Sequence, residues 1–151
     1  MHAAQYAAEV TAALTEDWDP HPRAFDALAR LLAELCEADR PLPGVVAFTL
    51  ELLDEIGSAP QLEHCVCCRR DLGGQEPVYF SSLEGGLVCR DCEGALAEKR
   101  QVPAAIVPVL SGVQGAGTEV CGPVFELLNY HLAHLMGRRP QLAEALLSSA
   151  R

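Results

Sequence analysis

Apolar residues recur at helical spacing along most of the chain, and turn-forming residues separate the stretches that carry them. Residues 3–16 are rich in alanine and hold few helix breakers, which predicts a first helix. The stretch DWDPHP at 17–22 predicts a turn, with Pro22 in the first turn of a second helix. The stripe that we expect to face the core from this second helix consists of Phe25, Leu28, Leu32 and Leu35.

A third helix is predicted after the break RPLPG at 40–44. Gly57 is placed to end it, and Pro60 prevents it from continuing. Cys36 lies beside the stripe of the second helix, so we expect it to be a small core residue and not a metal ligand. Short connections between three helices favour an antiparallel bundle. The apolar face of the third helix consists of Val45, Phe48, Leu52 and Ile56.

The last third of the chain again shows a helical pattern. The apolar stretch 102–110 is expected to be buried, with a helix that Pro103 can begin and Pro108 kinks or ends. The glycines of SGVQGAG at 111–117 are expected to form a loop. They resemble a phosphate cradle, but no clear strand precedes them and no Lys–Ser/Thr pair follows. An amphipathic helix is predicted over 123–136, ended by Gly137, and a short last helix over 140–149. The apolar stripe of the longer helix consists of Val124, Leu127, Leu128, Leu132 and Leu135.

Five of the seven cysteines lie in two short patches between these helical stretches, HCVCCRRDLGG and GGLVCRDCEG. Zinc prefers four soft or borderline ligands in a tetrahedron, and a two-residue spacer brings both sulfurs of a Cys-x-x-Cys pair to one side of a tight turn. This spacing selects Cys65 and Cys68 from the first patch, and Cys89 and Cys92 from the second. Cys67 is then a spare thiol. His64 is expected to flank the site, although it remains an alternative ligand.

The residues between the two cysteine pairs predict a short β-hairpin. PVYFSS at 77–82 is β-branched and aromatic, Gly85-Gly86 permits a tight turn, and Leu87-Val88 returns as the second strand. Two such pairs around a hairpin are typical of a zinc ribbon, which has too little apolar surface to fold without its metal. Four thiolates leave no open position for water, so we expect one structural zinc ion per chain and no metal-assisted hydrolysis.

The predicted fold class is therefore mostly α: a helical bundle with an inserted four-cysteine zinc ribbon. We expect one domain over 1–151, with the ribbon inserted at 62–95. The chain has 151 residues, half of them hydrophobic, so a substantial core can form. No apolar run is long enough to span a membrane, and the start lacks the pattern of a secretory signal. We therefore expect a cytoplasmic protein whose thiols stay reduced.

The net charge of −10 argues against nucleic-acid binding by the whole surface. Residues 1–64 hold 12 acidic and 3 basic side chains, whereas residues 65–100 hold 6 and 5. Any basic face must therefore come from the second half of the chain.

Motifs for catalysis are missing from the sequence. No nucleophile elbow, Walker lysine or pair of catalytic carboxylates is present. His131 and His134 are spaced to share one side of a helix, but we expect them to be surface or interface residues. A redox role for the two Cys-x-x-Cys pairs is the rival hypothesis, and it requires disulfides in place of a shared metal. Equal spacing of both pairs around a glycine hairpin favours the metal.

Longer stretches around the cysteines resemble one protein family. LLDEIGSAPQLEHCVCC, followed by FSSLEGGLVCRDC, is similar to the zinc-binding segment of the RecO family of bacterial DNA repair proteins. QYAAEVTAAL and DPHPRAFDALARLLAEL resemble the helices that precede that segment, so the similarity covers nearly the whole chain. One departure is Arg69, where a zinc knuckle commonly has glycine for its backbone freedom. A second is the missing N-terminal OB-fold, which leads us to expect a truncated chain or a shortened reading frame holding the C-terminal helical and zinc part.

The resemblance implies a non-enzymatic role in the RecF–RecO–RecR pathway of recombinational DNA repair. Proteins of this family bind DNA, anneal complementary strands and help to place RecA on DNA coated by single-strand-binding protein. The implied partners are RecR, the C-terminal tail of single-strand-binding protein and DNA, with no membrane and no small-molecule substrate. The runner-up function is a zinc-stabilised protein-interaction module without DNA binding of its own.

Basic residues near the cysteines are the candidates for DNA contact. Acidic residues are interleaved with them, so an ordinary solvated surface is an equal alternative. Tyr79 and Phe80 point to opposite faces of the hairpin, so at most one can stack on a base, and we expect only weak DNA binding. Arg138 and Arg139 follow a helix C-terminus, where the helix dipole favours cations, and they could instead meet an acidic peptide tail. The DNA-binding candidates are Arg69, Arg70, Arg90, Lys99 and Arg100.

Overall fold

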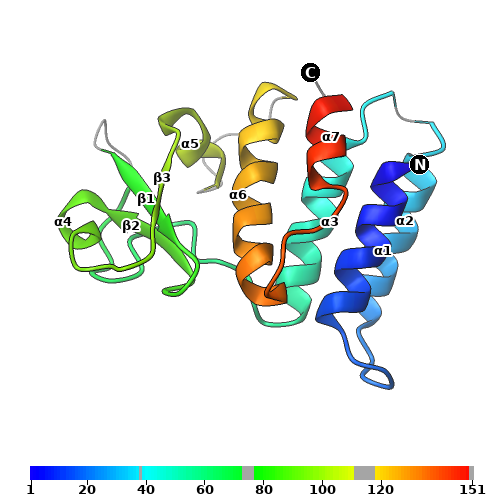
Figure 1. The fold of residues 1–151 in the computed structure, drawn as a ribbon, viewed down its shortest axis with the longest axis horizontal. Helices are drawn as coiled ribbons and strands as arrows, with labels where there is room; N and C mark the ends of the chain where they lie inside the picture. The colour runs from blue at the N-terminus through cyan, green and yellow to red at the C-terminus, as the bar shows by residue number, and fades with distance from the viewer. Residues whose placement is uncertain (38, 73–76, 111–117, 150–151) are drawn as a thin grey trace. The chain divides into compact units, whose positions relative to one another are not determined.

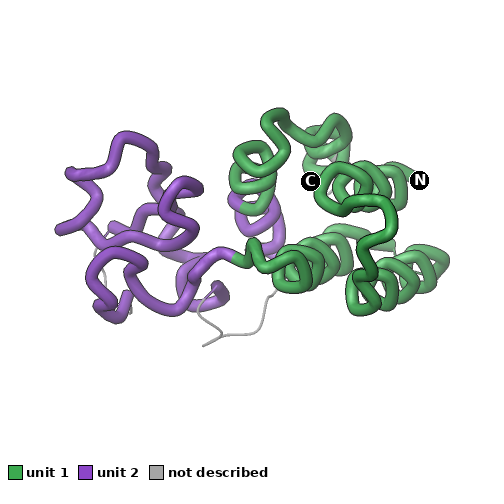
Figure 2. Tube along the Cα trace, turned by 90° about the horizontal axis from the view of Figure 1, so that it is seen from below, with its two compact units in different colours: residues 1–59, 128–151 green, residues 60–127 purple. Residues whose placement is uncertain are grey.

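The computed structural model describes residues 1–37, 39–72, 77–110 and 118–149, and the chain divides into two compact units. Unit 1 comprises residues 1–59 and 128–151, and unit 2 comprises residues 60–127 (Figure 2). Unit 2 is longer than the ribbon expected at 62–95. The predicted glycine loop at 111–117 lies outside the described residues. In the part of the chain that the structure describes, no helix has both the length and the hydropathy that a membrane crossing requires.

Unit 1 is helical throughout its described secondary structure (Figure 1). Helix α3 contacts both α1 and α2, and α1 also contacts α2 and α7. Pro22 occupies the first turn of α2, as the sequence predicted. Gly57 and Gly137, which follow α3 and α6, adopt φ values of 70° and 69°. The helices are α1 (His2–Leu14), α2 (Pro22–Glu34), α3 (Leu42–Glu55), the part of α6 (Thr118–Met136) from residue 128 onward, and α7 (Ala143–Ser149).

The core of unit 1 is mostly apolar, and a hydrogen-bonded polar pair lies within it. The Tyr6 hydroxyl donates to Asn129 Oδ1 at 3.0 Å, and both residues are buried. Burial raises the pKa of Tyr6 above its ordinary value, so the phenol stays neutral. The largest buried apolar side chains of this unit are Phe48, Leu31, Leu52, Leu53, Leu128, Leu132 and Val10.

The predicted core stripe of α2 was wrong. The helix buries Ala24, Ala27 and Leu31, whereas Phe25 is 71% exposed and Leu32 43% exposed. The buried side of α2 packs against α3 at Gly44, where an added Cβ would lie 3.0 Å from Glu34 Oε2 and 3.1 Å from Leu31 Cδ1. The two helices therefore approach closely on the side where α2 carries alanines. The expectation that Cys36 is a core residue was also wrong, since it is exposed.

Helices α3 and α6 follow their predicted patterns more closely. Val45, Phe48 and Leu52 are buried, and Ile56 lies at the half-exposed end of α3. Four of the five residues predicted for the α6 stripe are buried, and Leu135 is 37% exposed. The helix begins earlier than expected, with Pro123 inside it.

The two histidines of α6 differ from each other. His131 is buried, and its Nε2 lies 3.1 Å from the carbonyl oxygen of Ser58. The expectation that it is a surface or interface residue was therefore wrong, because α6 turns this side of the helix inward. His134 is exposed, as expected.

Unit 2 is built around a small antiparallel sheet with strand order β2-β1-β3. The predicted hairpin is confirmed: Val78 pairs with Cys89 and Ser81 with Gly86. The third strand was not predicted, since it has three residues and lies directly before Pro103. The elements are β1 (Val78–Ser81), β2 (Gly86–Cys89), α4 (Arg90–Glu93), β3 (Arg100–Val102), the 3-10 helix η1 (Ala104–Ile106), α5 (Val107–Leu110) and the part of α6 up to residue 127.

Candidate metal centre

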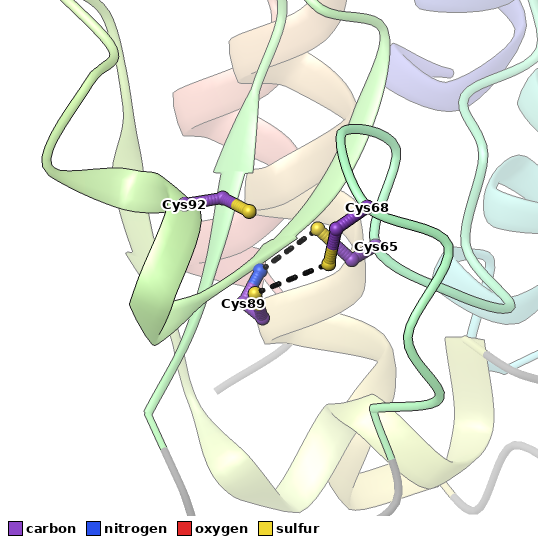
Figure 3. A group of neighbouring side chains, drawn as sticks. All are labelled: Cys65, Cys68, Cys89 and Cys92. Atoms are coloured by element: carbon purple, nitrogen blue, oxygen red, sulfur yellow. Dashed lines mark hydrogen bonds between the residues drawn. The ribbon is translucent and has the colours of Figure 1, made fainter.

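Four cysteine sulfurs gather in unit 2. The Sγ atoms of Cys65, Cys68, Cys89 and Cys92 all lie within 4.8 Å of one another, and they point toward a common centre (Figure 3). The Sγ atoms of Cys68 and Cys89 are 3.7 Å apart. These are the four residues that the two-residue spacing selected. Cys67 lies outside the group and is exposed, and the alternative ligand His64 is not part of it.

The first cysteine pair sits in a tight turn. The backbone N–H of Arg69 donates to the carbonyl oxygen of Cys65, and the N–H of Cys65 donates to the carbonyl oxygen of Arg70, each at 2.9 Å. Arg69 adopts a φ of 64°, the left-handed conformation that glycine adopts freely. The turn therefore forms with arginine at this position, at a cost of about 1 kcal/mol relative to glycine.

The second cysteine pair is placed by the end of a strand. Cys89 is the last residue of β2 and has an extended backbone. Helix α4 begins at the next residue, so Cys92 lies in the first turn of this helix. The N–H of Cys89 donates to Cys65 Sγ at 3.4 Å, which joins the two pairs directly.

The chain that enters the first turn pairs with the hairpin. Gln61 forms a parallel bridge with Gly86: Leu87 N–H donates to the Gln61 carbonyl at 2.9 Å, and Gln61 N–H to the Gly85 carbonyl at 2.8 Å. A Cβ at Gly86 would lie 2.5 Å from the Gln61 carbonyl oxygen, so only glycine fits here. Gly85 has a φ of 74° and supplies the positive-φ turn.

A residue that sequence reasoning missed holds the hairpin turn. Glu98 Oε2 accepts from the Ser81 hydroxyl at 2.9 Å and from the Leu83 N–H at 3.1 Å. Glu98 lies 15 residues from Leu83 in the sequence, so no pattern in neighbouring residues predicts this contact.

The electrostatics of the cluster favour the thiolate at Cys65 and the thiol at Cys92. Burial by itself raises the pKa of Cys65, but the backbone N–H groups of Cys89, Cys68 and Cys67 outweigh it and lower the pKa to about 6. Hydrogen bonds from Cys92 to the sulfurs of Cys89 and Cys68 raise the pKa of the Cys92 thiol. Four thiolates this close repel one another, so they need a cation to become charged together.

The donor set therefore fits a metal ion. Four soft sulfur ligands with converging Sγ atoms are able to hold one ion, and they fill a tetrahedral coordination sphere. All seven cysteines are free thiols, and the 3.7 Å between Cys68 and Cys89 is far longer than a disulfide bond.

Three of the five basic residues near the cysteines are engaged by carboxylates. Arg70 lies 2.5 Å from Asp91, Lys99 lies 2.5 Å from Glu93, and Arg100 lies 3.2 Å from Glu126. Arg69 and Arg90 are exposed, and within the described ranges no carboxylate lies within 4.0 Å of either.

The other residues predicted to contact partners are also placed. Arg138 and Arg139 are both exposed, and Arg138 pairs with Glu9 of α1. Phe80 is buried and Tyr79 half-buried, so Tyr79 is the aromatic residue of the hairpin with accessible surface.

Comparison with known proteins gives consistent matches. Residues 1–143 match the family model described as "Recombination protein O C terminal". The chain is 33% identical over 141 residues to "DNA repair protein RecO" of Myxococcus xanthus (strain DK1622), covering 90% of this chain and 57% of that protein. It is 32% identical over 147 residues to the protein of the same name from Anaeromyxobacter sp. (strain K), with the same coverage.

A third bacterial relative gives a similar match. "DNA repair protein RecO" of Roseiflexus sp. (strain RS-1) is 30% identical over 149 residues, which cover 92% of this chain and 52% of that protein. The chain thus spans a little over half the length of these relatives. Because the family model matches nearly the whole chain, the chain belongs to the RecO family.

Proposed function

We propose that this chain is the helical and metal-binding part of a recombination mediator that acts in DNA repair. The observation that carries the proposal is the match of residues 1–143 to the C-terminal family model, together with the four gathered cysteines. Three relatives bear the name of a DNA repair protein. The role is non-enzymatic, in the RecF–RecO–RecR pathway, with RecR, the tail of single-strand-binding protein and DNA as partners. The setting is the bacterial cytoplasm, at the nucleoid.

The ion in this proposal is zinc. In a tetrahedron with Zn–S bonds of about 2.3 Å, two sulfurs are roughly 3.8 Å apart. The 3.7 Å between Cys68 and Cys89 agrees with that edge. When bound, zinc supplies a structural cross-link, because four protein ligands leave no position for water. The protein itself positions the ligands. The N–H of Cys89 donates to Cys65 Sγ, and the turn that contains Arg69 holds the first cysteine pair. The backbone of Gln61 pairs with the hairpin.

Contact with DNA is proposed through phosphates, with Arg69 and Arg90 as its first residues. Both are exposed without a carboxylate at ion-pair distance among the described residues, and each phosphate contact releases counterions. Arg70, Lys99 and Arg100 contribute less, because a neighbouring carboxylate already balances each charge. The supply of cations is small, so binding is weak, and it falls as the salt concentration rises, with a shallow slope because few counterions are released.

The test is a titration of the zinc-loaded chain into a fluorescent single-stranded oligonucleotide at low and moderate salt, read by anisotropy. We expect weak binding that salt suppresses, with further loss in the double variant Arg69→Gly, Arg90→Gln. Glycine suits the positive φ at position 69, so this variant keeps the turn. Arg139→Gln, an exposed arginine of unit 1, is the matched control. Binding that the double variant leaves unchanged would reject the proposed DNA contact.

A second function has an observation in its favour. Three of the five candidate cations are ion-paired and the net charge is −10, which suits a zinc-stabilised module that binds proteins and not DNA. No binding to the oligonucleotide at low salt, together with retained binding to RecR, would favour this function. In unit 1, Arg139 is the exposed candidate for an acidic peptide tail, because Arg138 is held by Glu9.

A further inference from the structure

Unit 1 exposes large apolar side chains on one stretch of the chain, the turn between α1 and α2 and the outer face of α2. Trp18 is fully exposed in the turn, and Phe25 and Leu32 are 71% and 43% exposed. Phe25 and Leu32 are two helical turns apart, so they share a face and are separated by roughly 10 Å. The exposed Ala29 lies between them in sequence on the same side of the helix. Large apolar side chains exposed on one helix face and in the turn that precedes it are typical of an interaction site.

The backbone supports this interpretation at Trp18. Its φ is 71°, a left-handed conformation that costs a residue with a side chain about 1 kcal/mol. A strained residue that holds its side chain fully in solvent gains nothing for the fold from that side chain. Tryptophan is also among the residues most enriched where binding energy concentrates in interfaces.

The charges around this surface are negative and uncompensated. Both arginines of α2 are engaged, Arg23 with Asp54 and Glu55, and Arg30 with Glu51. The exposed carboxylates of Asp17, Asp26 and Glu37 border the apolar residues in sequence. Within the described residues, none of these three has a basic side chain within 4.0 Å.

We propose that the surface formed by Trp18, Phe25 and Leu32 docks a protein partner whose contact segment is a basic amphipathic helix. Its apolar side would cover the three residues, and its Lys and Arg side chains would meet the acidic border. DNA and anionic membranes are disfavoured, because their phosphates would face the same carboxylates. A second copy of the chain is disfavoured as well, since a two-fold contact places identical acidic borders against each other. This surface is separate from the cysteine site and goes beyond the proposed function.

The first experiment uses a defined probe, a fluorescein-labelled 18-residue amphipathic helix of leucine and lysine. One matched peptide carries glutamate in place of lysine, and another carries serine in place of leucine. We expect the Leu/Lys peptide to bind the zinc-loaded chain at least about tenfold more tightly than either matched peptide. Trp18 is the sole tryptophan of the sequence, so its emission should shift to the blue as the partner covers it. Equal binding of all three peptides, or no shift, would overturn the proposal.

Variants locate the binding surface. The double variant Phe25→Ser, Leu32→Ser should weaken binding about tenfold or more, and its circular dichroism should stay unchanged because both side chains are exposed. Leu83→Ser is the matched control, since Leu83 is a 62% exposed leucine in unit 2. If Leu83→Ser weakens binding as much as the double variant does, the assignment is wrong. Self-association of the unmodified chain in sedimentation, lost in the double variant, would assign the surface to a second copy and also overturn the proposal.

Discussion

The two units of this chain are stabilised by different means. Unit 1 buries a continuous set of large apolar side chains, among them Phe48, Leu52 and Leu132, between helices of up to 14 residues and part of a longer one. The sheet of unit 2 has strands of four, four and three residues, with four cysteines at its end. The stability of unit 1 is therefore distributed over many contacts, whereas that of the ribbon in unit 2 depends on one cluster. A single change should affect the two units very differently.

Removal of the metal should have the largest effect. Metal binding by four-cysteine sites supplies about 10–16 kcal/mol of folding free energy in small zinc domains, more than a short hairpin can replace. Cys89→Ser should therefore abolish zinc binding and amide-exchange protection in residues 78–102, while the helices of unit 1 keep their circular dichroism. Cys67→Ser, a thiol outside the cluster, is the control and should keep one zinc per chain. A Cys89→Ser protein that retained full zinc content would contradict the assignment.

Two adjacent leucines of α2 test how the core of unit 1 is arranged. Leu31→Ala should destabilise the unit by about 2–5 kcal/mol, because it removes a buried side chain and leaves a cavity. Leu32→Ala should cost less than about 1 kcal/mol, since Leu32 is 43% exposed. Denaturant unfolding followed by circular dichroism measures both. A larger loss for Leu32→Ala than for Leu31→Ala would mean that the stripe predicted from the sequence, and not the observed one, faces the core.

Two glycines test the packing in unit 2. Gly86→Ala should cost about 1–3 kcal/mol, because its Cβ would lie 2.5 Å from the Gln61 carbonyl oxygen. Gly94→Ala is the control: its backbone is helical, and a Cβ there meets nothing within 4 Å. Competition with a calibrated chelator reports the loss as weaker zinc affinity in Gly86→Ala. Equal zinc affinity in both variants would show that the contact with Gln61 does not support the site.

The ion pair between the two cysteine turns should have the smallest effect. Arg70 and Asp91 are both more than half exposed, so solvent screens their attraction. A double-mutant cycle with Arg70→Ala and Asp91→Ala should give a coupling below about 1 kcal/mol in zinc affinity. A larger coupling would indicate that this pair, and not only the metal, joins the two turns.

Regular spacing explains how far prediction from the sequence succeeded. The Cys-x-x-Cys pairs, the glycine hairpin and the order of helices follow local rules, since a two-residue spacer, a positive-φ turn and a proline at a helix start act over a few residues. Three of the four residues predicted for the stripe of the helix over 42–55 are buried, because this helix buries most of its apolar residues and a stripe drawn through them meets the core. The apolar residues of the helix over 22–34 cover one wide arc of its surface, so periodicity alone could not choose between Leu31 and Leu32.

The amino-acid sequence by itself thus determined the main helices and the hairpin, the four cysteines that come together and the resemblance to the RecO family. Only the tertiary structure decided which face of α2 is buried, because Gly44 permits close approach on the alanine side. It also decided that His131 is buried, that Glu98 holds the hairpin turn, and that Arg70, Lys99 and Arg100 are paired. Except for Lys99 and Glu93, which are six residues apart, these contacts join residues distant in the chain. Their partners are selected by packing and charge in three dimensions, for which a linear pattern carries no signal.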